Sequence, residues 1–180
     1  NDMTVEGTST FTLAGGTYNQ GDSDLTVLGD FDQTGGIFNG STDGNSRVID
    51  VSGDFNLTGG TFNNTDFELQ VEGDFNHQVA GTFNDSNSAV VLDGTGNQFV
   101  YGDTTFHDLT VDLDDSADAS RTLAFEDGST TTIETGGVLT LTGDGTATTA
   151  ELEIRAHNAG TVAVPTTQPI INVVDGSAGI

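Results

Sequence analysis

The sequence contains no cysteine, no tryptophan and no lysine, and only two prolines and one methionine among 180 residues. Without cysteine, neither disulfides nor thiolate metal sites nor redox motifs contribute to this protein. Its three basic residues are the arginines Arg47, Arg121 and Arg155, set against 28 acidic residues. The resulting formal net charge of −25 repels nucleic-acid phosphates and anionic lipids, so we expect neither a nucleic-acid partner nor membrane insertion.

Long apolar runs are also missing, so no segment is expected to cross a bilayer. The sequence begins directly in a strand-like pattern at Met3–Val5 without a basic leader, as expected of a processed or excised chain. So high a negative charge opposes compaction, and salt, divalent cations or acid should therefore stabilise the fold. These features favour an extracellular or cell-surface location in a saline or acidic setting.

Only 33% of the residues are hydrophobic, yet the chain contains 25 glycines and 11 phenylalanines. Valine, leucine, isoleucine and phenylalanine recur in short alternating runs, whereas a disordered acidic chain has few aromatic residues and little pattern. The length suits one domain with its own core. We therefore expect a folded single domain over residues 1–180, with tight turns around a narrow aromatic core.

Internal repeats are the strongest signal in the sequence. Three segments, 27–39, 51–63 and 71–84, share the pattern Val-x-Gly-Asp-Phe followed by a glycine and then Phe-Asn. A fourth, degenerate copy covers residues 5–19, with Tyr18 in place of the second phenylalanine. The period is roughly 20 to 24 residues, which is typical of a solenoid.

The second half of the chain keeps the alternation of strands and turns but loses the strict repeat. Strand-like runs follow at 90–92, 109–111, 131–133, 138–141, 152–154 and 170–174. Counting each run as one winding predicts roughly nine coils of about 20 residues. Residues 4–92 would form regular repeats and residues 93–180 looser coils.

The period by itself also fits leucine-rich repeats or a meander of hairpins. A leucine-dominated consensus is missing, and identical residues that recur once per period favour parallel, in-register stacking over antiparallel hairpins. Each coil of such an all-β solenoid lies about 4.8 Å above the last. The expected interior columns are Phe31, Phe55 and Phe75 in one, and Tyr18, Phe38, Phe62 and Phe83 in the other.

The segments 53–63, 102–111 and 121–133 resemble the repeat regions of large bacterial surface and adhesin-like proteins, and the closing run 170–180 is similar to their last strand and turn. The resemblance covers most of the chain. It implies a right-handed parallel β-helix, like that of pectate lyases, in an extracellular protein. It implies no activity, because most members of the group have none assigned.

Acidic residues suggest one metal site. Asp30, Asp54 and Asp74 occupy the same repeat position and would form a column of like charges that water or a cation must relieve. Oxygen-rich turns offer the hard ligands that calcium prefers, although no complete calcium-loop motif is present, and solvated surface acids are the alternative. The candidate calcium ligands are Asp112, Asp114, Asp115 and Asp118.

Four asparagines begin N-x-S/T sequons, which carry glycans in secreted archaeal or eukaryotic proteins. The number is close to what chance gives for so many asparagines, serines and threonines. The candidate glycosylation sites are Asn39, Asn56, Asn63 and Asn84.

Enzymatic function is not expected. Polysaccharide lyases and hydrolases of this architecture need clustered acids and commonly a basic residue that binds or deprotonates uronate. Here Arg121 and Arg155 fall in different coils, and His77, His107 and His157 are scattered. The charge of −25 would also repel a polyanionic sugar.

Both ends of the chain are expected to leave unpaired strand edges, which recruit further strands. We therefore predict a structural extracellular module, a subunit or stalk segment of a microbial surface filament. Its partners would be further copies stacked end to end, or adjoining domains of a longer chain. The alternative is a cell-surface adhesin module that binds a glycan or another surface; a polysaccharide lyase or hydrolase is the least favoured interpretation.

Overall fold

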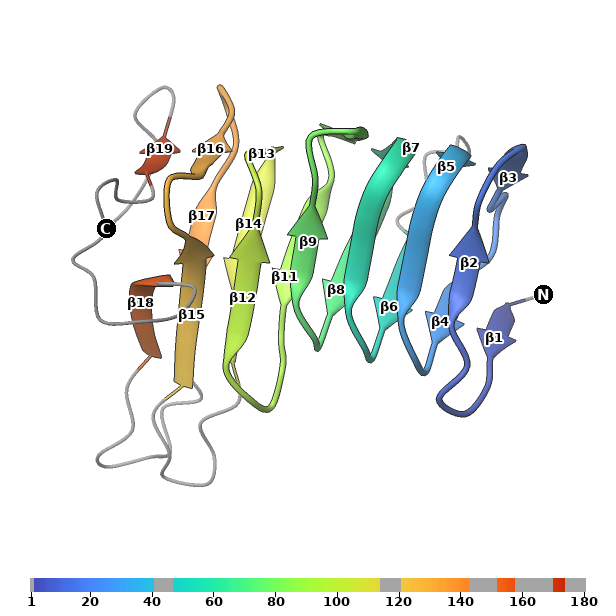
Figure 1. Cartoon of the computed structure of the whole chain (residues 1–180), viewed down its shortest axis with the longest axis horizontal. Coiled ribbons are helices and arrows are strands. Elements are labelled where there is room, and N and C mark those ends of the chain that lie inside the picture. Colours follow the sequence, from blue (N-terminus) through green and yellow to red (C-terminus); the bar gives the residue numbers. More distant parts are fainter. Residues whose placement is uncertain (1, 41–46, 114–120, 143–151, 158–169, 174–180) are drawn as a thin grey trace.

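The computed structural model describes residues 2–40, 47–113 and 121–142, together with the backbone of strands 152–157 and 170–173. The described residues form 19 strands and no helix. In particular, this part of the chain has no helix with the length and apolarity to span a membrane. Equivalent strands of successive windings pair in parallel and stack along one axis, so the chain is an all-β solenoid, as the repeat predicts (Figure 1).

Three parallel sheets make up the solenoid. The seven-stranded sheet contains β1 (Met3–Val5), β4 (Leu25–Val27), β6 (Arg47–Val51), β8 (Phe67–Val71), β11 (Ala89–Leu92), β14 (Asp108–Val111) and β17 (Leu139–Leu141). The second sheet contains β2 (Phe11–Leu13), β3 (Thr17–Asn19), β5 (Phe31–Asn39), β7 (Phe55–Thr65), β9 (Phe75–His77), β10 (Gly81–Ser86), β12 (Gln98–Tyr101), β15 (Arg121–Glu126) and β18 (Leu152–His157). The third contains β13 (Thr104–Phe106), β16 (Thr130–Ile133) and β19 (Ile170–Val173).

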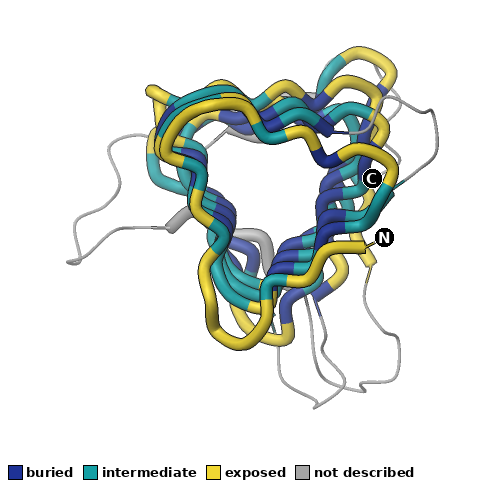
Figure 2. The backbone as a smooth tube through the Cα atoms, turned by 90° about the vertical axis from the view of Figure 1, so that its right-hand side faces the viewer, coloured by how far each residue is buried: buried dark blue, intermediate teal, exposed yellow. Residues whose placement is uncertain are grey.

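The windings enclose a triangular cross-section (Figure 2). Strands β5 and β7 each cover two sides of it, because they bend at the paired glycines of the repeat. Gly36 and Gly60 have φ of 74° and 80°, a backbone conformation that residues with a Cβ rarely adopt. A Cβ at Gly60 would also lie 2.4 Å from the carbonyl oxygen of Gly36. The stacked corners therefore require glycine for both conformation and space.

Aromatic side chains fill the interior of the first windings as two columns. Phe31 stacks on Phe55 with ring centroids 5.2 Å apart, and Phe55 on Phe75 at 5.0 Å. The second column, Tyr18, Phe38, Phe62 and Phe83, has spacings of 5.1, 4.7 and 5.8 Å. Rings of one column meet the other edge to face, as between Phe55 and Phe62 at 85°. Burial contributes roughly 2 to 3 kcal/mol per ring before entropy, which fixes the register.

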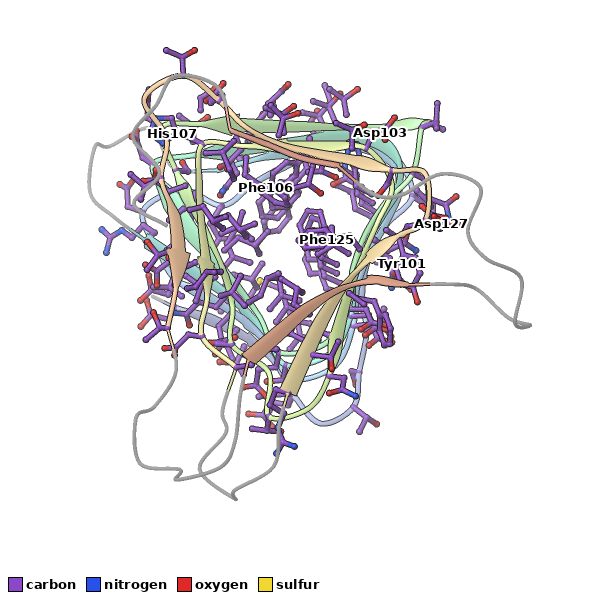
Figure 3. The ribbon with its side chains drawn as sticks, turned by 90° about the vertical axis from the view of Figure 1, so that its left-hand side faces the viewer. Tyr101, Asp103, Phe106, His107, Phe125 and Asp127 are labelled. Atoms are coloured by element: carbon purple, nitrogen blue, oxygen red, sulfur yellow. The ribbon has the colours of Figure 1, made fainter. Side chains whose placement is uncertain are left out.

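Aliphatic residues of the seven-stranded sheet line the remaining side of the interior. Leu25 pairs with Ile49, and Ile49 with Leu69, each fully buried. Along β8 the polar residues Glu68 and Gln70 alternate with the buried ones, the period of two that a half-buried strand requires. In the later windings Phe106 and Phe125 still point into the interior, while Asp103 lies on the outside (Figure 3).

The expected number of coils is wrong. Among the described residues, five regular windings begin at β1, β4, β6, β8 and β11, and two further strands, β14 and β17, follow in the seven-stranded sheet. The reason is that the later windings are longer. The chain from Leu109 to its partner Leu139 is one and a half times as long as the chain from Phe55 to its partner Phe75. Runs such as 109–111 and 131–133, counted as separate coils, are two sides of a single winding.

Candidate functional site

The corner between β9 and β10 differs from the corners before it. The repeat 71–84 is longer than segment 51–63 by a single residue. The additional residue makes Gln78, Val79 and Ala80 project from the solenoid, closed by a bond from the Gly81 N–H to the Gln78 carbonyl at 2.8 Å. Val79 is fully exposed. Residues 78–80 therefore form a projecting ridge at the corner where the preceding winding has its paired glycines.

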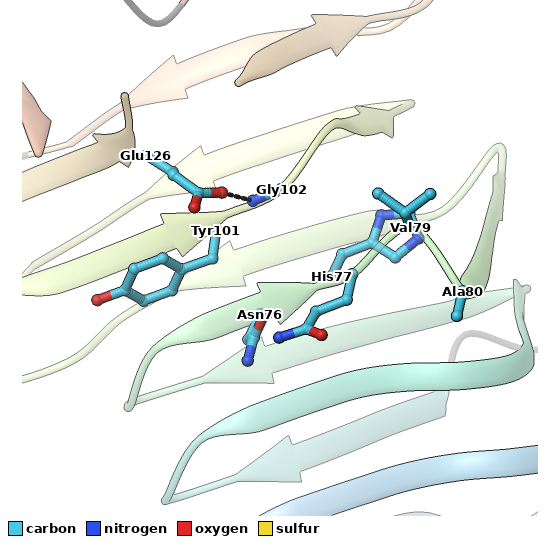
Figure 4. Close-up of a pocket in the computed structure, with 8 residues that line it drawn as sticks. Asn76, His77, Val79, Ala80, Tyr101, Gly102 and Glu126 are labelled. Carbon is cyan, nitrogen blue, oxygen red and sulfur yellow. Dashed lines mark hydrogen bonds between the residues drawn. The ribbon is translucent and has the colours of Figure 1, made fainter. Parts of the chain in front are cut away.

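The next winding turns tightly beside this ridge. Gly102 has φ of 83°, and a Cβ there would collide with the backbone carbonyl oxygen of His77. The Gly102 N–H donates to Oε2 of Glu126, one winding further on, at 2.8 Å. The step from projecting ridge to tight turn leaves a groove of about 660 Å³ (Figure 4). Its lining consists of Asn76, His77, Gln78, Val79, Ala80, Tyr101, Gly102 and Glu126.

Hydrogen bonds hold the groove's polar side chains in place. His77 Nε2 lies 3.2 Å from the Gly81 carbonyl oxygen, which can only accept, so this nitrogen is the donor. His77 Nδ1 lies 3.1 Å from the Thr104 hydroxyl. The Asn76 amide donates to Oδ1 of Asn56 at 3.3 Å. Both imidazole nitrogens are therefore engaged within the protein.

One aromatic ring lines the groove. Tyr101 stacks on Phe99 with ring centroids 6.0 Å apart and 27° between planes. Partial burial raises the pKa of the Tyr101 hydroxyl, and the carboxylates of Asp74, Glu126 and Asp54 raise it further. The phenol is therefore neutral over the physiological range. The groove thus combines an aromatic face with amide and carboxylate groups.

The predicted column of Asp30, Asp54 and Asp74 is present, and backbone N–H groups donate hydrogen bonds to its carboxylates. Asp30 Oδ1 accepts the backbone N–H of Asp54 at 3.0 Å, and Asp54 Oδ1 accepts that of Asp74 at 2.8 Å. Asp74 Oδ1 in turn accepts the N–H of Phe99 at 3.0 Å. Each carboxylate thus binds an amide of the next winding, so a bound cation is not required to hold the column together.

The sequon asparagines lie in hydrogen-bonded ladders on the outside. Asn63 Nδ2 donates to Asn39 Oδ1 at 2.8 Å, and Asn84 Nδ2 donates to Asn63 Oδ1 at 2.7 Å. Asn39 Nδ2 donates to Asn19, and Asn56 Nδ2 to Asp32. Glycosylation would replace a hydrogen on the same nitrogen. It stays a prediction at all four sites, in competition with the ladder bonds.

Most of the predicted calcium ligands lie outside the residues that the structure describes. Asp114, Asp115 and Asp118 lie outside the described residues, and Asp112 is exposed. In the described part of the chain no three histidine or acidic side chains are grouped as metal ligands. Calcium binding at Asp112–Asp118 stays a prediction.

The two histidines that the structure describes lie apart. His77 lies in the groove, and His107 Nδ1 is 3.2 Å from Oδ1 of Asp108 in another corner. The β15–β18 register places Arg121 opposite Leu152 and Arg155 opposite Ala124, so the two arginines occupy neighbouring windings. The side chain of His157 is outside the described set.

A buried polar pair was not anticipated from the sequence. Asn64 is fully buried and donates through Nδ2 to Asp85 Oδ1 at 2.8 Å. Asp85 Oδ2 accepts the backbone N–H of His107 at 3.0 Å. Burial raises the pKa of Asp85 to about 7, against the lowering effect of these hydrogen bonds and of His107. Asn64 Oδ1 is buried without a hydrogen-bond partner.

The groove also went unpredicted, although one signal for it exists. The extra residue in segment 71–84 indicates a bulged corner, but only the neighbouring tight turn makes that bulge a wall. Comparison with known proteins adds nothing to the site: no family model, no curated protein and no solved structure matches the chain.

Proposed function

We propose that the protein is a non-catalytic structural module of a microbial cell surface that extends by stacking solenoid windings end to end. The observation that carries the proposal is the unpaired outer edge of the first winding. Its strands β1, β2 and β3 pair with β4 and β5 on one side, and no described strand pairs with their other side. The regular parallel stack is thus open at this edge.

The backbone of this edge is arranged for another winding. The Met3 N–H donates to the Asp24 carbonyl at 3.0 Å, and the Phe11 N–H to the Asp30 carbonyl at 2.8 Å. Because successive residues of a parallel strand direct their amides to opposite neighbours, the N–H groups of the next residue along, Thr4 and Thr12, face the open side. Such rows of unpaired donors and acceptors template further strands.

The interior columns also end at this edge. Phe11 stacks on Phe31 at 5.0 Å and Tyr18 on Phe38 at 5.1 Å. Phe31 and Phe38 are fully buried, whereas Phe11 and Tyr18 are only partly buried. Met3 is 40% exposed beside them. A further winding, supplied by a second copy of the chain or by an adjoining part of a longer one, would bury these apolar groups and continue both aromatic columns.

Sedimentation velocity tests this proposal. The wild-type chain should associate with increasing concentration in molar salt, where repulsion between its charges is screened. The double variant Thr4→Pro/Thr12→Pro removes two outward N–H donors without breaking the bonds to β4 and β5, so association should weaken by roughly tenfold or more, about 1.4 kcal/mol. The matched Thr4→Ala/Thr12→Ala variant keeps the amides and should assemble like the wild type.

Uniform fibres in negative-stain micrographs would identify end-to-end growth. A wild-type chain that stays monomeric at its solubility limit, or proline and alanine variants that associate equally, would contradict stacking through this edge.

An adhesin module that binds a glycan is the second candidate function. The groove beside Gly102 supports it, because its lining combines an aromatic ring with amide groups on the outer surface of the solenoid. The groove lies in the fourth to sixth windings, away from the open edge, so the two functions are compatible.

A further inference from the structure

We propose that the groove beside Gly102 binds an uncharged carbohydrate and does not cleave it. The inference rests on the second candidate function and names its site and ligand class. It is independent of stacking through the first winding.

The groove has the size and rigidity of a small-ligand site. Its volume of about 660 Å³ lies within the range of pockets that bind small molecules. Backbone contacts hold both sides: the Gly81–Gln78 turn closes the ridge, and the Gly102 N–H is bound to Glu126. Regular strands flank the two corners. Little ordering is therefore needed when a ligand binds.

Tyr101 supplies an aromatic surface for the apolar face of a sugar ring. An aromatic face carries negative charge density, which attracts the weakly positive C–H groups of a pyranose. Contact with Phe99 restrains the Tyr101 ring, so binding costs little side-chain entropy. Val79, on the projecting ridge, adds exposed apolar surface across the groove.

The polar lining matches hydroxyl groups, each of which donates and accepts. Asn76 and Gln78 offer amide donors and acceptors, and the Asn76 amide is oriented by its bond to Asn56. Glu126 binds the Gly102 N–H through Oε2, so Oε1 can accept from a ligand hydroxyl. Neutral polyols satisfy this mixture without leaving a buried charge unpaired.

Charge excludes acidic sugars. Glu126 lines the groove, and the carboxylates of Asp54 and Asp74 act on the same Tyr101 hydroxyl. The whole chain carries a formal net charge of −25. A uronate or sialic acid would meet repulsion both from the groove and from the surrounding surface.

The lining also lacks the parts needed for hydrolysis. Glycosidases use two carboxyl groups on either side of the scissile bond, whereas Glu126 is the one acidic residue among those that line this groove. His77 cannot serve as a free base, because both of its nitrogens are engaged with Thr104 and Gly81. The groove is built to hold a sugar without transforming it.

Saturation-transfer NMR on the whole chain tests the inference with defined oligosaccharides. The neutral probes are cellohexaose, maltohexaose, laminarihexaose, mannohexaose and chitohexaose; the charged comparators are trigalacturonate and the chitosan hexamer. At least one neutral probe should bind, and trigalacturonate should not. Tyr101→Ala should weaken binding by roughly tenfold or more, whereas Tyr101→Phe keeps the ring and should stay within about threefold of the wild type.

Several results would overturn the inference. These are the absence of transfer to every neutral probe, equal binding by Tyr101→Ala and wild type, or binding of the chitosan hexamer alone, which would indicate a cation site. Shortened products in chromatograms of the bound oligosaccharide would refute binding without cleavage. Urea unfolding of each variant verifies its fold, and sedimentation of the same samples reports stacking separately.

Discussion

Replacing Asp85 with asparagine should stabilise the protein at neutral and alkaline pH but not in acid. Asp85 is buried at a corner of the solenoid, where Asn64, the His107 backbone and Glu134 surround it. Asparagine resembles the protonated acid: one atom can accept the His107 N–H, and the amide can donate to Asn64 Oδ1, which now has no partner, once the Asn64 amide turns over. The variant thus has the favourable hydrogen bonds of the protonated state at every pH.

The magnitude follows from the pKa. Burial raises the pKa of Asp85 from 3.8 to about 7, so between these values the folded protein holds a proton that the unfolded chain has released. Stability contributed by the neutral carboxyl is complete below pH 3.8 and is lost as the pH rises toward 7. At about 1.4 kcal/mol per pKa unit, the loss reaches roughly 4 to 5 kcal/mol. Asp85→Asn should not show this loss.

Urea unfolding followed by circular dichroism, from pH 4 to pH 8.5 at constant high salt, measures the effect. The stability difference between Asp85→Asn and wild type should be near zero at pH 4 and grow to about 4 kcal/mol above pH 7. Asp22→Asn is the matched control, because Asp22 is exposed, lies outside the predicted calcium site and loses the same charge on replacement. A difference that is constant with pH, or equal for both variants, would refute the assignment.

Two further predictions concern the core and the corners. Phe55→Ala should cost about 3 to 5 kcal/mol in urea unfolding, because Phe55 stacks on rings above and below it; a loss under about 1 kcal/mol would contradict the aromatic columns. Gly60→Ala should cost at least about 2 kcal/mol, from its positive φ and its contact with Gly36, whereas Gly96→Ala, in open space, should change stability by less than about 0.5 kcal/mol. Equal effects of the two alanines in the same assay would contradict the corner geometry.

The repeat was sufficient to predict the parallel stacking and its register. Phe31, Phe55 and Phe75 recur once per winding, and in-register pairing is the arrangement that buries all three together. The coil count failed where the repeat ended. Strand-like runs at 109–111 and 131–133 look alike in sequence, and nothing local indicates that they form two sides of one winding.

The candidate site depended on contacts between windings. Segment 71–84 reveals its extra residue, but the groove also requires Gly102 and Glu126, which belong to the two windings that follow this segment. The same limit applied to Asp30, Asp54 and Asp74, which suggested a repulsive column of charges until their carboxylates were seen to bind backbone amides of the next winding.

The order of residues therefore determined which side chains stack, because a strict period brings like residues into line and hydrophobic burial keeps them there. Tertiary structure alone decided how far each corner projects, which carboxylates find donors, and that Asp85 is buried beside Asn64. Those properties depend on the lengths of the turns in the windings above and below. A side chain is buried or hydrogen-bonded by residues of those windings, which lie about 20 or more positions away in the sequence.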